Sequence, residues 1–157
     1  MNRKFKIALL FMLIIAQVLI HRYVDKLKLN VDLFYLVLVY VAVKQGVLRT
    51  IFSATIIGWI TDFFSGGIIG VFGFSRVCIV FLIHEISPYL DLNRYHFVFL
   101  LIAISLSLSN LIASLFFHFI YGFDFELSLI LNQPLFTALV GVLLVAFPNV
   151  REKLDVY

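Results

Sequence analysis

The chain has 157 residues, of which 63% are apolar and only 13% charged, with a formal net charge of +3. A soluble domain is about 45–50% apolar and about 25% charged, and no soluble fold of this length hides so much apolar surface, so the bilayer has to be its solvent. The small net charge says little about nucleic acid, and we expect no nucleic-acid partner. The single cysteine, Cys78, excludes an internal disulfide and a cysteine-based metal cluster. We therefore expect one integral membrane domain over residues 1–157.

The predicted elements are apolar segments, because a spanning helix needs about 20 mostly apolar residues. In chain order they are Phe5–Ile20, Asp32–Val43, Val47–Phe64, Gly67–Ile83, Phe97–Tyr121 and Leu127–Phe147. No small-x-small cleavage site follows the first segment, so we expect it to remain as a span. The second segment either borrows apolar residues before it or is a short or re-entrant helix. The pattern predicts an all-α, polytopic transmembrane helical bundle of five to six spans, with six favoured.

The basic residues predict the orientation of this bundle. With six spans and the amino terminus inside, the inner segments hold Arg3, Lys4, Lys6, Lys44, Arg49, Arg94, Arg151 and Lys153, whereas the outer ones hold Arg22, Lys26 and Lys28. This bias follows the positive-inside rule, so we expect both termini in the cytoplasm. The outer loops are too short to fold as a domain, which places the work of the protein in the membrane plane or at its edges.

The most unusual stretch, which we call the glycine-rich segment, runs from Gly58 to Arg76 as GWITDFFSGGIIGVFGFSR. A carboxylate at membrane depth costs roughly 2.5–3.5 kcal/mol, so Asp62 needs a partner. One interpretation makes Asp62 a cap at a helix end, half in water, which accepts backbone N–H bonds from the Ser65–Gly67 turn or from the start of the next helix. The other pairs it with Arg76 across a tight helical hairpin.

Two further features predict contacts between helices. Gly66, Gly70 and Gly73 follow the spacing i, i+4 and i+7, which predicts one smooth helical face that receives another backbone. Asn110 lies in the middle of the fifth segment, where an amide hydrogen-bonds across to another helix, either of the same chain or of a partner. The polar run Asn132-Gln133-Pro134 interrupts the sixth segment in a similar manner.

The catalytic motifs that we tested are incomplete. His84-Glu85 begins like a zinc-protease motif, but Pro88 stands where the second histidine is required. Ser65-Gly66 invites comparison with intramembrane serine proteases, but Phe63 replaces the first glycine of their motif. No phosphate-binding loop or carboxylate cluster for a metal is present in the sequence. We therefore expect no catalytic, cofactor or metal site, and no enzymatic activity.

The pattern Gly58-x-x-x-Asp62-x-x-Ser65-Gly66-x-x-x-Gly70 resembles the signature of the MreD family, the rod shape-determining membrane proteins of bacteria. The resemblance implies a non-enzymatic component of the cell-elongation machinery in the cytoplasmic membrane. It also implies binding to MreC, a single-span protein, within an assembly that contains RodA, a penicillin-binding transpeptidase and MreB. Asp62, Gly66 and Gly70 are the positions that the family pattern carries over, whereas Arg76 is added on physical grounds.

A second hypothesis is the substrate-binding subunit of an energy-coupling-factor type vitamin transporter, which is also a small bundle of about six spans. Such subunits usually carry an Ala-x-x-x-Ala stripe in the first span. Here Ala8 and Ala16 are separated by Met12, so that stripe is broken. A vitamin pocket also requires convergent polar groups from loops, and the sequence offers few of them.

Overall fold

The computed structural model of the chain describes residues 31–65, 70–92, 94–122 and 128–146, and these residues form helices without any strand. The elements are α2 (Leu33–Lys44), α3 (Val47–Ser65), α4 (Val71–Ile86), the 3₁₀ helix η2 (Ser87–Tyr89), α5 (Tyr95–Tyr121), the π-helix η3 (Ser128–Asn132) and α6 (Gln133–Ala146). The all-helical prediction is confirmed over these ranges. The first predicted span, Phe5–Ile20, lies outside the described residues.

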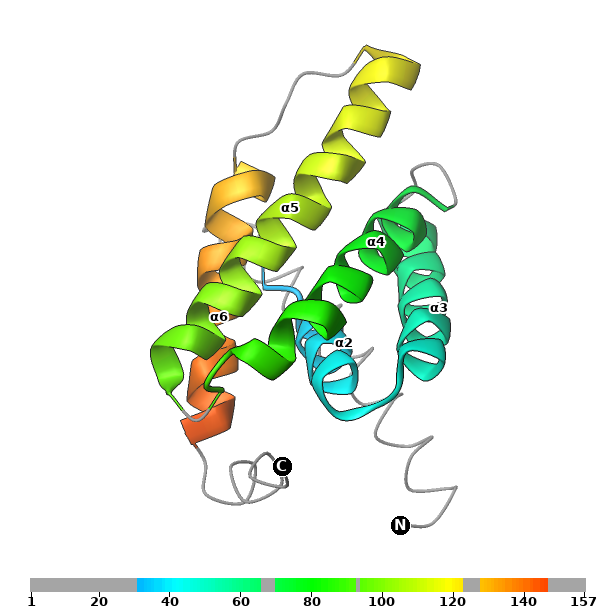
Figure 1. The fold of residues 1–157 in the computed structure, drawn as a ribbon. Coiled ribbons are helices and arrows are strands. Elements are labelled where there is room, and N and C mark those ends of the chain that lie inside the picture. The colour runs from blue at the N-terminus through cyan, green and yellow to red at the C-terminus, as the bar shows by residue number, and fades with distance from the viewer. Residues whose placement is uncertain (1–30, 66–69, 93, 123–127, 147–157) are drawn as a thin grey trace.

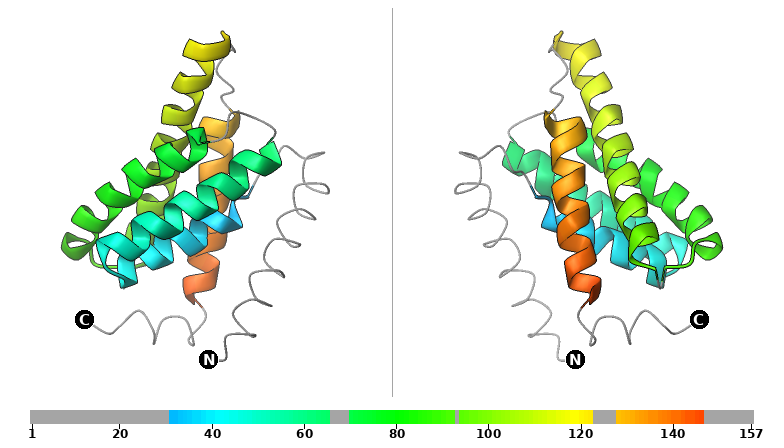
Figure 2. Two further views of the ribbon diagram at one scale, coloured as in Figure 1. Left: turned by 90° about the vertical axis from the view of Figure 1, so that its right-hand side faces the viewer. Right: turned by 90° about the vertical axis from the view of Figure 1, so that its left-hand side faces the viewer.

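The helices follow one another in alternating directions (Figure 1). The α2–α3 and α4–α5 turns therefore lie at one end of the bundle, whereas α3 and α5 end, and α4 and α6 begin, toward the other (Figure 2). Within the described ranges, three helical stretches are long and apolar enough to cross a membrane: Val71–Tyr89, Tyr95–Tyr121 and Leu129–Ala146. The count of five to six spans therefore stays a prediction.

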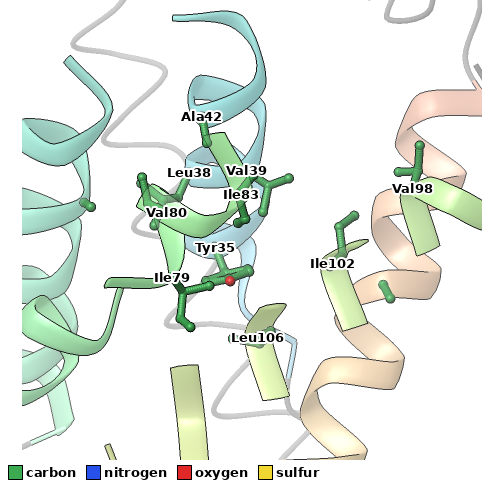
Figure 3. Packing of buried hydrophobic residues seen from close by; sticks show 12 residues of the cluster. Tyr35, Leu38, Val39, Ala42, Ile79, Val80, Ile83, Val98, Ile102 and Leu106 are labelled. Atoms are coloured by element: carbon green, nitrogen blue, oxygen red, sulfur yellow. The ribbon is translucent and has the colours of Figure 1, made fainter. Parts of the chain in front are cut away.

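Helix α2 is short and central. Its 12 residues rise about 18 Å, well under the ~30 Å of a hydrocarbon core. It nevertheless contacts α3, α4, α5 and α6. Its buried side chains pack with those of α4 and α5 in one hydrophobic cluster. The members are Tyr35, Leu38, Val39 and Ala42 from α2, Ile79, Val80 and Ile83 from α4, and Val98, Ile102 and Leu106 from α5 (Figure 3). The core of the protein is therefore built around a helix too short to span the bilayer.

The start of α2 is set by its own first polar residue. Asp32 has extended backbone dihedrals, and its Oδ1 accepts the N–H of Tyr35 at 2.9 Å, which makes it the N-cap of the helix. The same residue is 5% exposed, so this helix end is buried inside the bundle. A buried helix end requires partners for its polar groups, and those partners come from other helices.

Helices α3 and α4 approach each other through two glycines. A Cβ atom placed on Gly58 would lie 2.1 Å from the Cα and 2.6 Å from the N of Gly73. Only a residue without a side chain can occupy position 58 at this separation. This contact brings α3 against α4 over their length, in an antiparallel hairpin.

Candidate functional site

The carboxylate of Asp62 holds the beginning of α4. Its Oδ2 accepts the N–H groups of Gly70 at 2.7 Å and Gly73 at 3.4 Å, and its Oδ1 accepts that of Phe72 at 2.9 Å. Helix α4 has no side-chain cap of its own, because Gly70 occupies the N-cap position. The capping interpretation is therefore confirmed, in the form that uses the next helix start. One part of it is wrong: Asp62 is 1% exposed, so it is buried in the protein and not half in water.

Arg76 is buried in the bundle and makes its ion pair with Asp32. Its Nη2 lies 2.5 Å from Oδ2 of Asp32, and its Nη1 donates to the hydroxyl of Thr61 at 2.7 Å. Arg76 is 2% exposed, so both charges are removed from solvent together. The alternative that assigned Arg76 to Asp62 named the wrong carboxylate.

The reason lies in the depths of the two carboxylates. Asp62 reaches the first turn of α4, whereas Arg76 lies about 7–9 Å further along that helix. The buried start of α2 brings Asp32 to the level of Arg76. The sequence offered one signal for this partner, since a lone arginine within a span requires a carboxylate and Asp32 opens the second apolar segment. The sequence could not choose between Asp32 and Asp62, because the depth at which α2 begins is set by tertiary packing.

Polar contacts also tie α5 and α6 into this region. The N–H of Asp32 donates to the hydroxyl of Thr137 on α6 at 3.0 Å. The hydroxyls of Ser75 on α4 and Ser109 on α5 lie 3.3 Å apart. Together with the Asp32–Arg76–Thr61 contacts, these bonds connect all five described α-helices at one level of the bundle. Buried polar groups of this kind are stable only when they satisfy one another, as they do here.

Asn110 hydrogen-bonds to another helix of the same chain. Its Nδ2 donates to the carbonyl of Leu129 at 2.7 Å and to Oε1 of Gln133 at 3.0 Å. Pro134 has no N–H to offer the carbonyl five residues before it, which in the π register is that of Leu129. Asn110 supplies the missing donor, so the intramolecular interpretation of this residue is confirmed. The helix is not interrupted at Pro134: it changes from π to α between Asn132 and Gln133 and continues through the proline.

The predicted glycine face is wrong. Gly70 has φ +108° and precedes α4, whereas Gly73 lies inside that helix, so the two do not continue one helical stripe. Gly66 lies outside the described residues, and Ser65 is the last residue of α3. The close approach of backbones involves Gly58 and Gly73 instead, within one chain. Among the described glycines of this segment, Gly70 thus serves a turn, and Gly58 and Gly73 serve a contact within the chain.

With this geometry in place, comparison with known proteins identifies the family. A family model described as rod shape-determining protein MreD matches residues 2–148. The chain belongs to the MreD family. No curated protein and no solved structure matched it. In this MreD-family chain, Asp62 lies near the end of α3, and Gly70, Gly73 and Arg76 lie at or near the start of α4. We call this contact between the two helices the α3–α4 junction, and Arg76 joins it to α2 through Asp32.

The chemistry of this region is that of helix assembly. Over the described ranges, no three His, Cys, Asp or Glu side chains gather where they could hold a metal ion. His84 of the incomplete zinc-protease motif lies with its Nδ1 3.3 Å from the carbonyl of Ala42, so it links α4 to α2. The carboxylates of Asp32 and Asp62 accept bonds from a guanidinium and from backbone amides, which fixes helices in place.

The hydrogen bonds of Asp62 to the start of α4 predict how much stability is lost when this residue is replaced. Both oxygens of Asp62 accept N–H bonds, so Asp62→Asn would turn an NH₂ group toward a backbone donor and leave part of the α4 start unsatisfied. We expect a loss of about 1–3 kcal/mol in stability, measured as a lower unfolding midpoint in mild detergent. Asp91→Asn is the control, because Asp91 pairs with Arg94 at an exposed site where such pairs contribute under about 1 kcal/mol. Equal midpoints for the two variants would contradict the cap.

Proposed function

We propose that this chain is the polytopic membrane component of a bacterial cell-elongation machinery, which binds MreC and supports peptidoglycan synthesis along the side wall. The observation that carries the proposal is the family match over residues 2–148. RodA, a penicillin-binding transpeptidase and MreB belong to the same proposed assembly. The family match gives no support to the vitamin-transporter alternative.

The proposed role is to hold partners together and not to convert a substrate. The buried polar groups of the α3–α4 junction are occupied by contacts within the chain, as described above. The outward faces of the helices carry apolar side chains, for example Phe52 and Trp59 on α3 and Leu143 on α6. Such faces suit lipid tails and other transmembrane helices, which associate by packing.

The test of this function is recovery of partners from membranes. The full-length chain, extracted in mild detergent from a rod-shaped host, should bring down MreC, as measured by mass spectrometry of the bound proteins. Depletion of the chain should give rounded, swollen cells while vitamin uptake stays normal. Recovery of an ATPase pair in place of MreC, with rods unaffected by depletion, would overturn the proposal.

We also propose that the protein lies in the cytoplasmic membrane with both termini inside. Helix α2 ends at Lys44, α3 begins near Arg49 and α5 begins after Arg94, and these ends share one side of the bundle (Figure 1). Basic residues gathered on one side favour the cytoplasm for that side.

Reporter fusions test this orientation. A reporter that is active only outside the cytoplasm should be silent when it is fused after Tyr157. The same reporter should be active when it is inserted between Lys26 and Lys28. An active fusion after Tyr157 would contradict the six-span arrangement, because an odd number of spans places the two termini on opposite sides.

A further inference from the structure

The first two described helices are poor membrane spans by themselves. The stretches that are long and apolar enough to cross a membrane belong to α4, α5 and the η3–α6 region. Helix α2 has 12 residues and begins with a buried aspartate. Helix α3 has 19 residues, but it contains Arg49, Asp62 and several hydroxyl side chains. We refer to α2 and α3 together, from Asp32 to Ser65, as the α2–α3 hairpin.

Helix α4 satisfies the buried carboxylates of this hairpin. Asp32 pairs with Arg76, and Asp62 accepts the backbone N–H groups that open α4. The hydroxyl of Thr61 also accepts a bond from Arg76. An ionised side chain at membrane depth is costly unless it is paired, so the carboxylates of Asp32 and Asp62 depend on α4 for their place in the bilayer.

The packing of the hairpin points to the same helix. Gly58 of α3 lies so close to Gly73 of α4 that a Cβ at position 58 would meet backbone atoms. Close packing of this kind drives helix association in lipid, where no hydrophobic force draws helices together. Polar and packing contacts therefore both bind the α2–α3 hairpin to α4.

We infer that the α2–α3 hairpin inserts across the membrane only together with α4, and that the pairing of Asp32 with Arg76 is what allows α2 to enter. Arg76 follows Asp32 by 44 residues, so the partner is synthesised after the helix that needs it. Helices α2 and α3 run in opposite directions, so the hairpin starts and ends toward the end of the bundle where α4 begins, and leaving it on that side keeps the direction of α4 unchanged. Later helices thus determine the topology of earlier ones.

The experiment compares the membrane side of two turns in the full-length chain. Gly46 is exposed in the α2–α3 turn, where a Cβ meets nothing within 4 Å, and Tyr89 is 89% exposed in the α4–α5 turn. Both turns lie at the same end of the bundle (Figure 1). Gly46→Cys and Tyr89→Cys, each in a Cys78→Ala background, are labelled with a membrane-impermeant maleimide before and after permeabilisation. Labelling is measured on newly made, pulse-labelled chains, so that the side of each cysteine is recorded even for a variant that is degraded later.

Three variants are then compared with the parent. In the parent, positions 46 and 89 should react from the same side. Arg76→Leu should move position 46 to the side opposite position 89, because Asp32 has lost its partner. Adding Asp32→Leu to Arg76→Leu should return position 46 to the side of position 89, since an apolar pair needs no partner. Phe74→Leu is the matched control on α4, at an exposed position, and should behave as the parent does.

The comparison uses the relative side of the two turns, so it does not depend on which side is the cytoplasm or on the proposed function. The inference is overturned if position 46 stays with position 89 in Arg76→Leu. It is also overturned if the double variant leaves position 46 on the opposite side, because the unpaired charge would then not be the cause. A side change in Arg76→Leu that the double variant reverses supports the inference.

Discussion

Gly58→Ala should remove most of the folded protein from the membrane, although it adds a single methyl group. That methyl would lie 2.1 Å from the Cα and 2.6 Å from the N of Gly73. Backbone atoms cannot turn away as a flexible side chain can, so α3 and α4 have to separate. Overpacking typically costs 1–3 kcal/mol and occasionally more, and contact with backbone atoms favours the upper part of that range. The measurement is the amount of chain in membranes together with its unfolding midpoint in mild detergent.

Two other glycines make this prediction specific. Gly46→Ala should be neutral or slightly stabilising, because its Cβ meets nothing within 4 Å and alanine restricts the unfolded chain. Gly73→Ala should be milder than Gly58→Ala, because its Cβ would meet the side chain of Trp59 at 3.4 Å, an ordinary contact distance. Gly58 and Gly73 lie in the same contact, so the smaller loss expected for Gly73→Ala follows only from the geometry of that contact. Similar losses for Gly58→Ala and Gly73→Ala would show that the helices do not cross as described.

The helices themselves were largely predictable from the sequence. The segments Val47–Phe64 and Phe97–Tyr121 correspond to α3, Val47–Ser65, and α5, Tyr95–Tyr121, because a helix is one of the few stable forms of a backbone segment in a bilayer. The short Asp32–Val43 segment is a helix as well, Leu33–Lys44. Its role at the centre of the bundle was not predictable, since its length indicates only that it cannot span the membrane alone.

The sequence predicted which residues form the site better than it predicted their partners. The sequence indicates Asp62, Arg76 and Asn110 because polar groups in lipid need partners, and each of them is buried and hydrogen-bonded in the structure. The choice of partner depends on depth and on crossing geometry, which periodicity does not encode. The predicted glycine face failed for the related reason that the helix was assumed to continue through Gly70, whose left-handed conformation separates the turn from α4.

Breaking the ion pair between Asp32 and Arg76 should cause the second large loss of stability. Asp32→Asn keeps a good N-cap for α2, because the amide oxygen can still accept the Tyr35 N–H, but it removes the charge that faces Arg76. A buried guanidinium is then left without its counter-charge, and breaking a buried pair in this way costs about 3–5 kcal/mol. We expect a large fall in the unfolding midpoint in mild detergent and less folded chain in the membrane. The exposed variant Asp91→Asn provides the comparison.

Combined variants separate the pair from its individual residues. Asp32→Asn with Arg76→Leu should recover much of the lost stability, because no unpaired charge remains in the bundle. The exchanged pair, Asp32→Arg with Arg76→Asp, should recover less, because an arginine at position 32 cannot accept the Tyr35 N–H and α2 loses its cap, at about 1 kcal/mol. Thr61 would also face a carboxylate in place of its guanidinium donor. If the exchanged pair is as stable as the parent, Asp32 acts only as a charge. If Asp32→Asn alone is as stable as the parent, the Asp32–Arg76 pair does not hold α2 in the bundle.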